Sequence, residues 1–412
     1  MKDRLVEFPN RYRIVPVEGA TNVVDLLPVT GVVTDEGTPL NKHTLLRDAT
    51  AALYRLGPDA VVNDVFMALK MPAGYYGFEI MAKFSDGTPA SGLQLDGLLS
   101  FEGSTAVTDE NGFCYAMAVS TSPTITFNQY IGIKNSTITI QADSDVLYTP
   151  IDLVIQKATE VELASSNSLI FPYAATIDIC AIGGGGAGAR STASNSDNRP
   201  CAGGGGGGYL KNLFNVSVVA GDVLSCTIGA GGSYTWGSGD KNGDDGGTTT
   251  VSLNGKQILQ ASGGAGGTAR GNGGRGGSGG SGGGGSSGTS STAYAGVGGS
   301  NGGNGETVNG SDGGTGQGTS TRKFGEADGT LYCGGGGGAS SVATNVFLAA
   351  TGGAGGGGSG AAIFSSTDNV RGGDATNYGG GGGGAANNMY SSSNNNTAKY
   401  GAGRQGVVFV RW

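Results

Sequence analysis

Apolar and polar positions follow three different patterns along the 412 residues of this chain. In residues 1–72, short apolar runs such as RYRIVPVEG are broken by Gly and Pro, which predicts short extended segments with turns. A helix is then predicted from Thr38 to Gly57, with an apolar face at Leu45, Leu46, Ala49, Leu53 and Leu56. A second, shorter helix is predicted after Asn63 or Asp64. We therefore expect residues 1–72 to form a small α+β module.

Residues 73–158 alternate apolar and polar positions with a period of two, as a half-buried strand does. The segments YYGFEIMAKFSDGTPASGLQL, TAVTDENGFCYAMAV, STITIQA and YTPIDLVIQ are predicted to contain strands, with DENG as a hairpin turn. The DGTPASG and TDENG motifs resemble those of carboxypeptidase-regulatory or transthyretin-like β-sandwiches. That resemblance implies a β-sandwich that acts as a spacer.

Residues 159–412 combine strands with glycine tracts. IDICAI directly precedes the first tract, GVVFVRW follows the last, and strand candidates such as YLKNLFNVSVV and TTTVSLNGKQILQ lie between them. Only 12 of the 85 glycines lie before Gly183, and only one of the 11 prolines, Pro200, lies after it, so two kinds of chain are joined here. A first and a last strand that bracket the region indicate one closed domain.

Three structures compete for the glycine tracts. A flexible linker joins two parts, whereas these tracts return at least six times between strands. Collagen needs glycine at every third position and abundant proline, and the tracts have neither. The third alternative is a bundle of polyproline-II-like helices, whose outward N–H and C=O groups bond to neighbouring helices that glycine allows to come close. We predict this bundle, with scaffold positions at Gly183, Gly184, Gly203, Gly205, Gly208, Gly334, Gly336, Gly355 and Gly381.

The segments IDICAIGGGGAGA, GGGGGGYLKNLFNVSVVAGDVLSCTIGAGGS and GAGRQGVVFVRW resemble the glycine-rich domain of bacteriophage and prophage tail proteins. They are also similar to the glycine-rich domain of receptors of the anaplastic lymphoma kinase type. The resemblance implies a mainly β fold, namely a tumour-necrosis-factor-like jelly roll with inserted glycine helices. In tail-fibre adhesins the loops between glycine helices contact the host. This implies a host-surface glycan or protein as the partner, and a homotrimer as the assembly.

The motif EGTPLNK, followed by the first predicted helix, resembles the opening of tail-associated proteins of phages and prophages. That resemblance implies docking to tail or baseplate proteins through residues 1–72 and a place in the virion. Residues 1–7 lack the apolar centre of a secretory signal, and no run of about 18 apolar residues predicts a membrane span, so we expect synthesis in the host cytoplasm. A formal charge of −8 argues against nucleic acid as a partner.

The chain offers few groups for catalysis, and we expect a non-enzymatic protein without a cofactor. His43 is the single histidine and has no predicted partner. GGSGG at 276–280 and the recurring GxGxxG pattern arise by chance in tracts rich in Gly and Ser. The five cysteines are odd in number and lack CxxC spacing, which predicts free thiols. A glycan hydrolase remains an alternative that requires paired carboxylates, with Glu326 and Asp328 among the loop acids.

One loop has part of the spacing of a calcium site. Asp240, Asn242 and Asp244 alternate as the first ligands of such a loop do. Asp245 stands where the loop needs glycine, and Val251 stands where it needs glutamate. A solvated polar loop is therefore the preferred interpretation, and an ion site is the alternative.

Loops between the predicted glycine helices carry aromatic and amide side chains. Aromatic faces stack on sugar rings, and amides both donate and accept hydrogen bonds. The candidate receptor-binding residues are Tyr234, Trp236, Tyr294, Phe324, Tyr332, Asn387, Asn388 and Tyr390. For Phe324 and Tyr332, packing in a local core is an equal alternative. The predicted function is host attachment by a phage tail fibre, and a purely structural tail component is the alternative.

Overall fold

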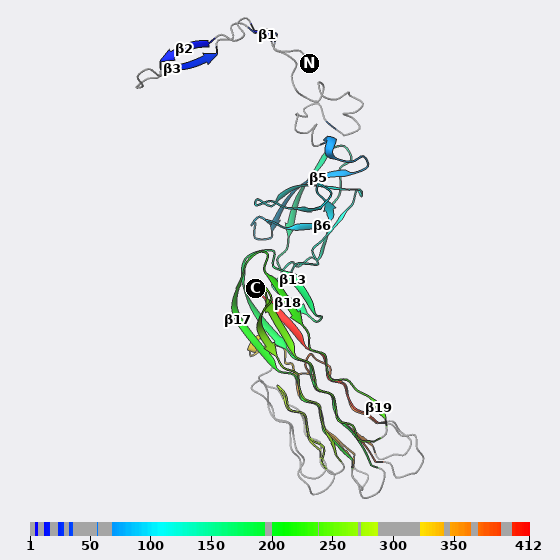
Figure 1. Cartoon of the computed structure of the whole chain (residues 1–412). Coiled ribbons are helices and arrows are strands. Elements are labelled where there is room, and N and C mark those ends of the chain that lie inside the picture. Colours follow the sequence, from blue (N-terminus) through cyan, green and yellow to red (C-terminus); the bar gives the residue numbers. More distant parts are fainter. Residues whose placement is uncertain are drawn as a thin grey trace. The chain divides into compact units, whose positions relative to one another are not determined.

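The computed structural model describes residues 5–6, 12–16, 24–28, 33–35, 56, 68–193, 200–237, 239–270, 273–286, 322–341, 347–363, 370–388 and 398–412. These residues form a mainly β protein (Figure 1). The chain divides into two compact units, one of residues 1–127 and 135–156 and one of residues 128–134 and 157–412. Within the described ranges, no helix is long and apolar enough to cross a bilayer.

The first 35 residues contain four short strands. β2 (Tyr12–Pro16) pairs with β3 (Val24–Pro28), and β1 (Leu5–Val6) pairs with β4 (Val33–Asp35), both antiparallel. The predicted extended segments are therefore confirmed. The predicted helix from Thr38 to Gly57 lies outside the described residues except for the buried Leu56, and of the second helix residues 68–70 are described and helical.

The rest of the first unit is built on one sheet system. Its strands run in the order β10-β9-β6-β8-β5-β11, with β7 paired to β6. Their bounds are β5 (Tyr76–Phe84), β6 (Gln94–Leu99), β7 (Thr105–Val107), β8 (Phe113–Ala118), β9 (Thr124–Thr126), β10 (Thr137–Thr139) and β11 (Tyr148–Ile155). The period-two pattern is confirmed in β5, where alternate side chains from Phe78 to Phe84 are at most 2% exposed. Pro150 lies in β11, an edge strand where a missing N–H is tolerated.

The DENG turn is present, but the strands beside it do not pair with each other. Gly112 N–H donates to the Asp109 carbonyl at 3.1 Å, yet β7 pairs with β6 and β8 pairs with β5. Thr108 explains the difference, because its N–H donates to the Leu93 carbonyl at 3.0 Å and its Oγ1 accepts from Leu93 N at 2.8 Å. The predicted hairpin is thus right for the turn and wrong for the strand partners.

The second unit begins with a sandwich of two four-stranded antiparallel sheets. One has the order β12-β29-β14-β17 and the other β13-β18-β20-β21. Their bounds are β12 (Glu160–Leu163), β13 (Asn167–Ile170), β14 (Ala175–Ile182), β17 (Leu210–Val218), β18 (Val223–Thr227), β20 (Thr249–Leu253), β21 (Lys256–Ala261) and β29 (Val407–Arg411). Both sheets contribute to one buried core, which includes Ile177, Leu224, Val251 and Val410. As expected, the first and last strands close the domain, because β14 pairs directly with β29. The jelly-roll topology stays a prediction.

β14 and β29 are buried on both faces, which accounts for their continuous apolar sequences. Alternate side chains, among them Cys180, Ile182 and Phe409, face away from the sandwich core into a second cluster that residues 324–333 cover. All five cysteines are free and buried, as the sequence predicts. Burial raises the pKa of the Cys180 thiol to about 11, so the reactive thiolate is disfavoured.

The glycine tracts continue the sandwich strands and run side by side (Figure 1). In tract 183–189, every N–H donates to another tract at 2.8–3.0 Å. The neighbouring tract that accepts the hydrogen bond changes with a three-residue repeat. Residues 183, 186 and 189 donate to residues 209, 206 and 203 of one tract. Residues 184 and 187 donate to residues 247 and 244 of a second tract, and residues 185 and 188 donate to residues 404 and 401 of a third. Three residues per turn without internal hydrogen bonds is the geometry of a polyproline-II helix.

Tract 203–208 lies in the interior of this bundle. Its N–H groups donate at 2.7–3.1 Å to residues 265–268, 281–284 and 379–382 in turn. Its carbonyls, with that of Tyr209, accept from residues 183–189, 277–280 and 336. The tract therefore has neighbours on all sides, and all of its glycines are buried. The GGGGGG sequence is a packed structural element instead of a linker.

Close backbone approach explains why these positions are glycine. A Cβ built on Gly205 would overlap the Gly186 carbonyl oxygen, far inside the 3.0 Å that real Cβ atoms keep. The other predicted scaffold glycines would likewise meet a backbone carbonyl: Gly183, Gly184, Gly203, Gly208, Gly334, Gly336, Gly355 and Gly381. Gly355 differs in its backbone, because its φ of +92° belongs to a turn and not to a polyproline-II helix.

A Gly205→Ala substitution tests the packing directly. We expect it to lower the free energy of unfolding of the glycine-rich unit by about 3 kcal/mol or more, and Gly205→Val to prevent folding of the unit. Chemical denaturation followed by circular dichroism measures this. The matched control is Gly273→Ala, since a Cβ there has nothing within 4 Å and the backbone φ is not positive. Equal effects of the two alanines would contradict the packed bundle.

Amide hydrogen exchange gives a second test. In a bundle, the N–H groups of residues 203–208 should exchange within about tenfold of the rate of β14 amides, because both open only when the unit unfolds. Mass spectrometry of peptides spanning the two segments measures the rates. Exchange of residues 203–208 at the rate of an unstructured chain would show that the tract is a tether.

Candidate functional site

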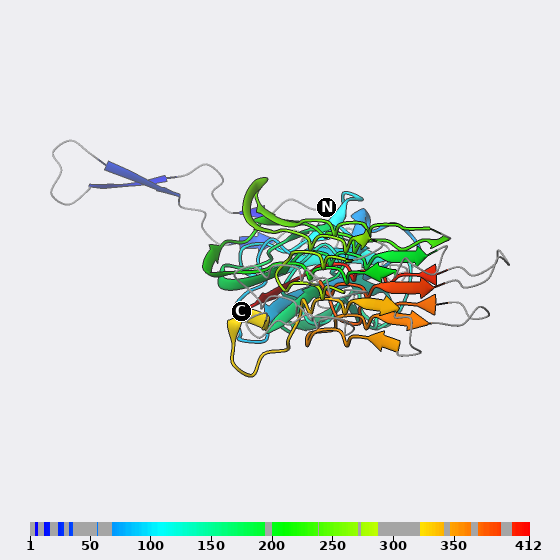
Figure 2. The same ribbon diagram turned by 90° about the horizontal axis from the view of Figure 1, so that it is seen from below.

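The glycine tracts end in a second set of short strands, which we call the tip. Figures 1 and 2 show these strands at the end of the domain opposite the sandwich. They form three small sheets with the orders β15-β27-β25, β22-β16-β23-β24 and β19-β28-β26. Their bounds are β15 (Arg190–Ala193), β16 (Cys201–Ala202), β19 (Trp236–Gly237), β22 (Ala269–Arg270), β23 (Ala339–Ser341), β24 (Phe347–Ala349), β25 (Ala361–Ile363), β26 (Val370–Arg371), β27 (Ala385–Asn388) and β28 (Ala398–Lys399).

Small side chains fill the interior of the tip. Ala187, Ala385 and Ala398 form a fully buried cluster around Tyr400. The Tyr400 hydroxyl lies 3.2 Å from Thr235 Oγ1, which satisfies its polar end. Packing of these alanine methyl groups around Tyr400 therefore joins the tip to the glycine bundle.

Arg190 holds the backbone of one loop of the tip through hydrogen bonds. It is 6% exposed, and it donates from Nε to the Gly239 carbonyl at 2.9 Å and from Nη1 to the Thr235 carbonyl at 3.0 Å. Burial lowers the pKa of the Arg190 guanidinium, while nearby Tyr400 and Asp240 act in the opposite direction. The two hydrogen bonds hold the backbone around Trp236 against β15.

The Tyr234 ring contacts a basic residue from another strand, and the backbone of Trp236 pairs with that same residue. Tyr234 is 43% exposed, and Lys399 Nζ lies 3.2 Å from the centroid of its ring. Trp236 pairs in register with Lys399, which pairs in register with Arg371 on the next strand. The structure thus places one predicted receptor-binding position, Trp236, in this sheet and another, Tyr234, just before it, with the exposed Tyr234 ring against the Lys399 cation.

The predicted asparagines lie in β27. Asn387 is fully buried opposite Thr192 and Ile363, and among the described residues neither its Nδ2 nor its Oδ1 has a hydrogen-bond partner. Asn388 lies opposite Ala193 at the end of the same strand. Burial removes Asn387 from the exposed surface of the described tip. Tyr294 and Tyr390 lie outside the described residues.

Phe324 and Tyr332 lie on the sandwich instead of the tip. They are 4% and 9% exposed and pack in the second cluster with Phe409. The Arg411 guanidinium lies 4.1 Å from the Phe324 ring centroid, and it donates to the Glu326 carboxylate. The packing alternative therefore describes both rings, and the Glu326 carboxylate is engaged in a structural ion pair.

Asp240, Asn242 and Asp244 do not converge on one point. Asp240 accepts from Ser191 Oγ at 2.9 Å, Asn242 accepts from Ala269 N at 3.0 Å, and Asp244 accepts from Ser233. These positions belong to a segment whose partners repeat every third residue, so alternate side chains point to different neighbours. The three side chains with calcium-like spacing thus make three separate hydrogen-bond contacts. Among the described residues, no group of three or more His, Cys, Asp or Glu side chains is placed to hold a metal ion.

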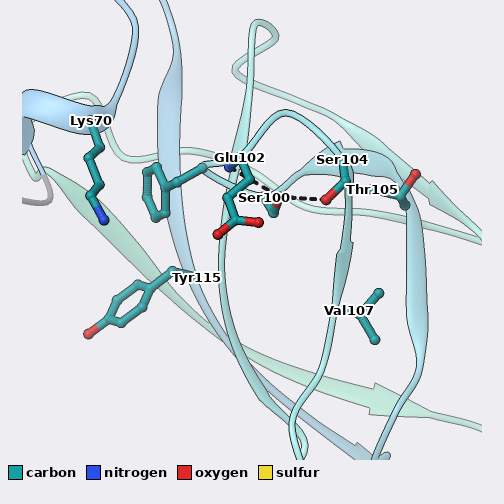
Figure 3. A pocket seen from close by; sticks show the side chains of 8 residues that line it. Lys70, Ser100, Glu102, Ser104, Thr105, Val107 and Tyr115 are labelled. Atoms are coloured by element: carbon teal, nitrogen blue, oxygen red, sulfur yellow. Dashed lines mark hydrogen bonds between the residues drawn. The ribbon is translucent and has the colours of Figure 1, made fainter.

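No motif in the sequence predicted one of the grooves on the described surface. A groove of about 580 Å³ lies on the sheet of the first unit, between the turn after β6 and the strands β7 and β8 (Figure 3). The sequence SFEGST places an aromatic ring and a carboxylate beside a glycine turn, a signal with no established spacing.

An Arg190→Met substitution should loosen the tip loop. The two carbonyls would lose charged donors in a partly buried site, and we expect unfolding to require about 1.5–3 kcal/mol less free energy. Arg371→Met is the control, because its guanidinium side chain is 57% exposed and its ion pair with Asp374 contributes at most about 1 kcal/mol. Denaturant titration measures both, and an equal effect of the two variants would count against the brace.

Comparison with known proteins identifies the second unit. Residues 163–412 match a family model described as a glycine-rich domain. A search of curated proteins found no match. Because the family match covers more than half of the chain, the protein belongs to the glycine-rich domain family.

Proposed function

We propose that this protein is a non-enzymatic tail or tail-fibre protein of a bacteriophage or prophage, which attaches to the bacterial surface through the tip. The observation that carries the proposal is the exposed Tyr234 ring, which lies against Lys399 just before β19, where the tip meets the glycine bundle. Residues 1–72 dock to the tail, and the assembly is a homotrimer. The partner is a glycan or protein of the host surface.

The glycine bundle supports an adhesin role in a physical way. Hydrogen bonds between backbone groups make most of the contacts between the tracts, so the scaffold places few demands on the side chains where the tracts end. In one tip sheet, β15, β25 and β27 end side by side at residues 193, 363 and 388. These aligned strand ends give the proposed attachment surface a fixed base.

The aromatic and basic residues of the tip suit recognition of a sugar or protein surface. Tyr and Trp provide a large rigid contact area at low entropic cost, and they dominate the energetics of many interfaces. The cation of Lys399 fixes the Tyr234 ring before a ligand arrives. Pre-ordered contacts lose less entropy on binding.

Adsorption to cells tests the proposal. Fluorescently labelled full-length protein should bind permissive bacteria and compete with virions for adsorption. We expect the double substitution Tyr234→Ala and Trp236→Ala to weaken cell binding at least about tenfold, because interface aromatics commonly contribute more than 1 kcal/mol each.

Phe214→Ala is the matched control, since Phe214 is 46% exposed but lies in β17 of the sandwich. Its cell binding should equal that of the natural protein. Failure of the natural protein to bind any permissive host would reject the adhesin role. Equal binding by the tip variant and the control would favour a purely structural tail component.

A further inference from the structure

The groove on the first unit has the features of a ligand site. Its volume of about 580 Å³ falls within the roughly 300–1,000 Å³ of typical small-ligand pockets. Figure 3 shows Lys70 and Tyr115 on one side of the opening, Thr105 and Val107 on the other, and the Glu102 carboxylate directed between them. Polar and apolar groups therefore converge on one open space.

A tight turn presents Glu102 in a fixed position. Ser100 N–H donates to the Ser104 carbonyl at 2.7 Å, Gly103 N–H donates to the Ser100 carbonyl at 3.0 Å, and the Ser100 and Ser104 hydroxyls lie 2.8 Å apart. Glu102 N–H also donates to Ser100 Oγ at 3.3 Å. Gly103 has a φ of +83°, which the turn requires and which other residues rarely adopt. The rim is thus ordered without a ligand.

Packed aromatic rings hold the side of the groove. Tyr115 lies 5.0 Å from both Phe113 and Tyr148, measured between ring centroids, and Phe101 lies 6.0 Å from Tyr148. Tyr115 and Phe101 also line the groove and are half-buried. Val107 adds an apolar side chain that is 51% exposed. The groove therefore offers an apolar surface that is fixed before binding.

The charges of the groove indicate a neutral ligand. Lys70 contributes an ammonium group and Glu102 a carboxylate, and neither has an ion-pair partner among the described residues. For a ligand with net charge of either sign, attraction by one of these groups is offset by repulsion from the other. A neutral ligand that carries both a hydrogen-bond donor and an acceptor satisfies both.

We propose that this groove binds a saccharide that contains an N-acetylated amino sugar. The apolar face of the pyranose stacks on Tyr115, the acetamide N–H donates to Glu102, and the acetamide carbonyl accepts from Lys70. The hydroxyls of Ser104 and Thr105 bond to the ring hydroxyls. The site is separate from the tip and does not depend on the function proposed for it.

The test uses the full chain and saturation-transfer NMR, with tetra-N-acetylchitotetraose as the probe and cellotetraose as the matched sugar without acetamides. We expect binding of the first sugar with at least about fivefold higher affinity than the second, as the loss of charged hydrogen bonds predicts. Tyr115→Ala should weaken binding at least about tenfold, and Glu102→Gln and Lys70→Gln about threefold or more each.

Glu102 and Lys70 are exposed, so those two variants keep the fold even if Tyr115→Ala does not. Glu110→Gln, an exposed carboxylate outside the groove, is the matched control and should bind as the natural protein does. Tyr234→Ala, at the tip, should also leave the affinity unchanged. No saturation transfer, equal affinity for the two sugars, unchanged binding by the groove variants, or loss of binding in Tyr234→Ala would each overturn the proposal.

Discussion

Hydrogen bonding between glycine backbones is the interaction on which the rest of this structure depends. Glycine loses more conformational freedom on ordering than any other residue, roughly 1–2 kcal/mol per residue for the backbone, so a single glycine helix is unstable. In the bundle, each N–H of residues 183–189 and 203–208 finds a carbonyl on another tract. Stability is therefore cooperative, because no tract can be ordered until its neighbours are in place.

This dependence explains the architecture around the bundle. The tracts have almost no side chains to define which tract lies beside which, and the sandwich supplies that definition because its strands lead directly into the tracts. The apolar cores on both faces of β14 and β29 hold the first and last tracts in register. At the other end, Tyr400, the alanine cluster and the Arg190 brace join the tracts to short sheets. Side-chain packing at the two ends thus supports a middle that is held mainly by backbone hydrogen bonds.

Several features of the fold followed from sequence because they depend on local chemistry. Alternation predicted β5, the apolar runs predicted β14 and β29, and the recurrence of glycine tracts between strands predicted a packed bundle. Features that depend on distant partners did not follow. The pairing of β7 with β6 depends on Thr108 and Leu93, and the burial of Phe324 and Tyr332 depends on their packing against residues of β14 and β29. The spacing of Asp240, Asn242 and Asp244 left an ion site as the alternative to a solvated polar loop, and the three-residue repeat of the tract directs these side chains to different partners.

The sequence by itself determined that the second half of this chain is a mainly β, glycine-rich domain, since glycine abundance, scarce proline and bracketing strands are properties of local composition and order. Only the tertiary structure decided which side chains are available to a ligand. Tyr234 is exposed while Asn387 is buried, and Tyr115 and Glu102 lie beside Lys70, more than 30 residues earlier in the chain. Exposure and convergence depend on contacts between segments far apart in sequence, and no local pattern specifies them.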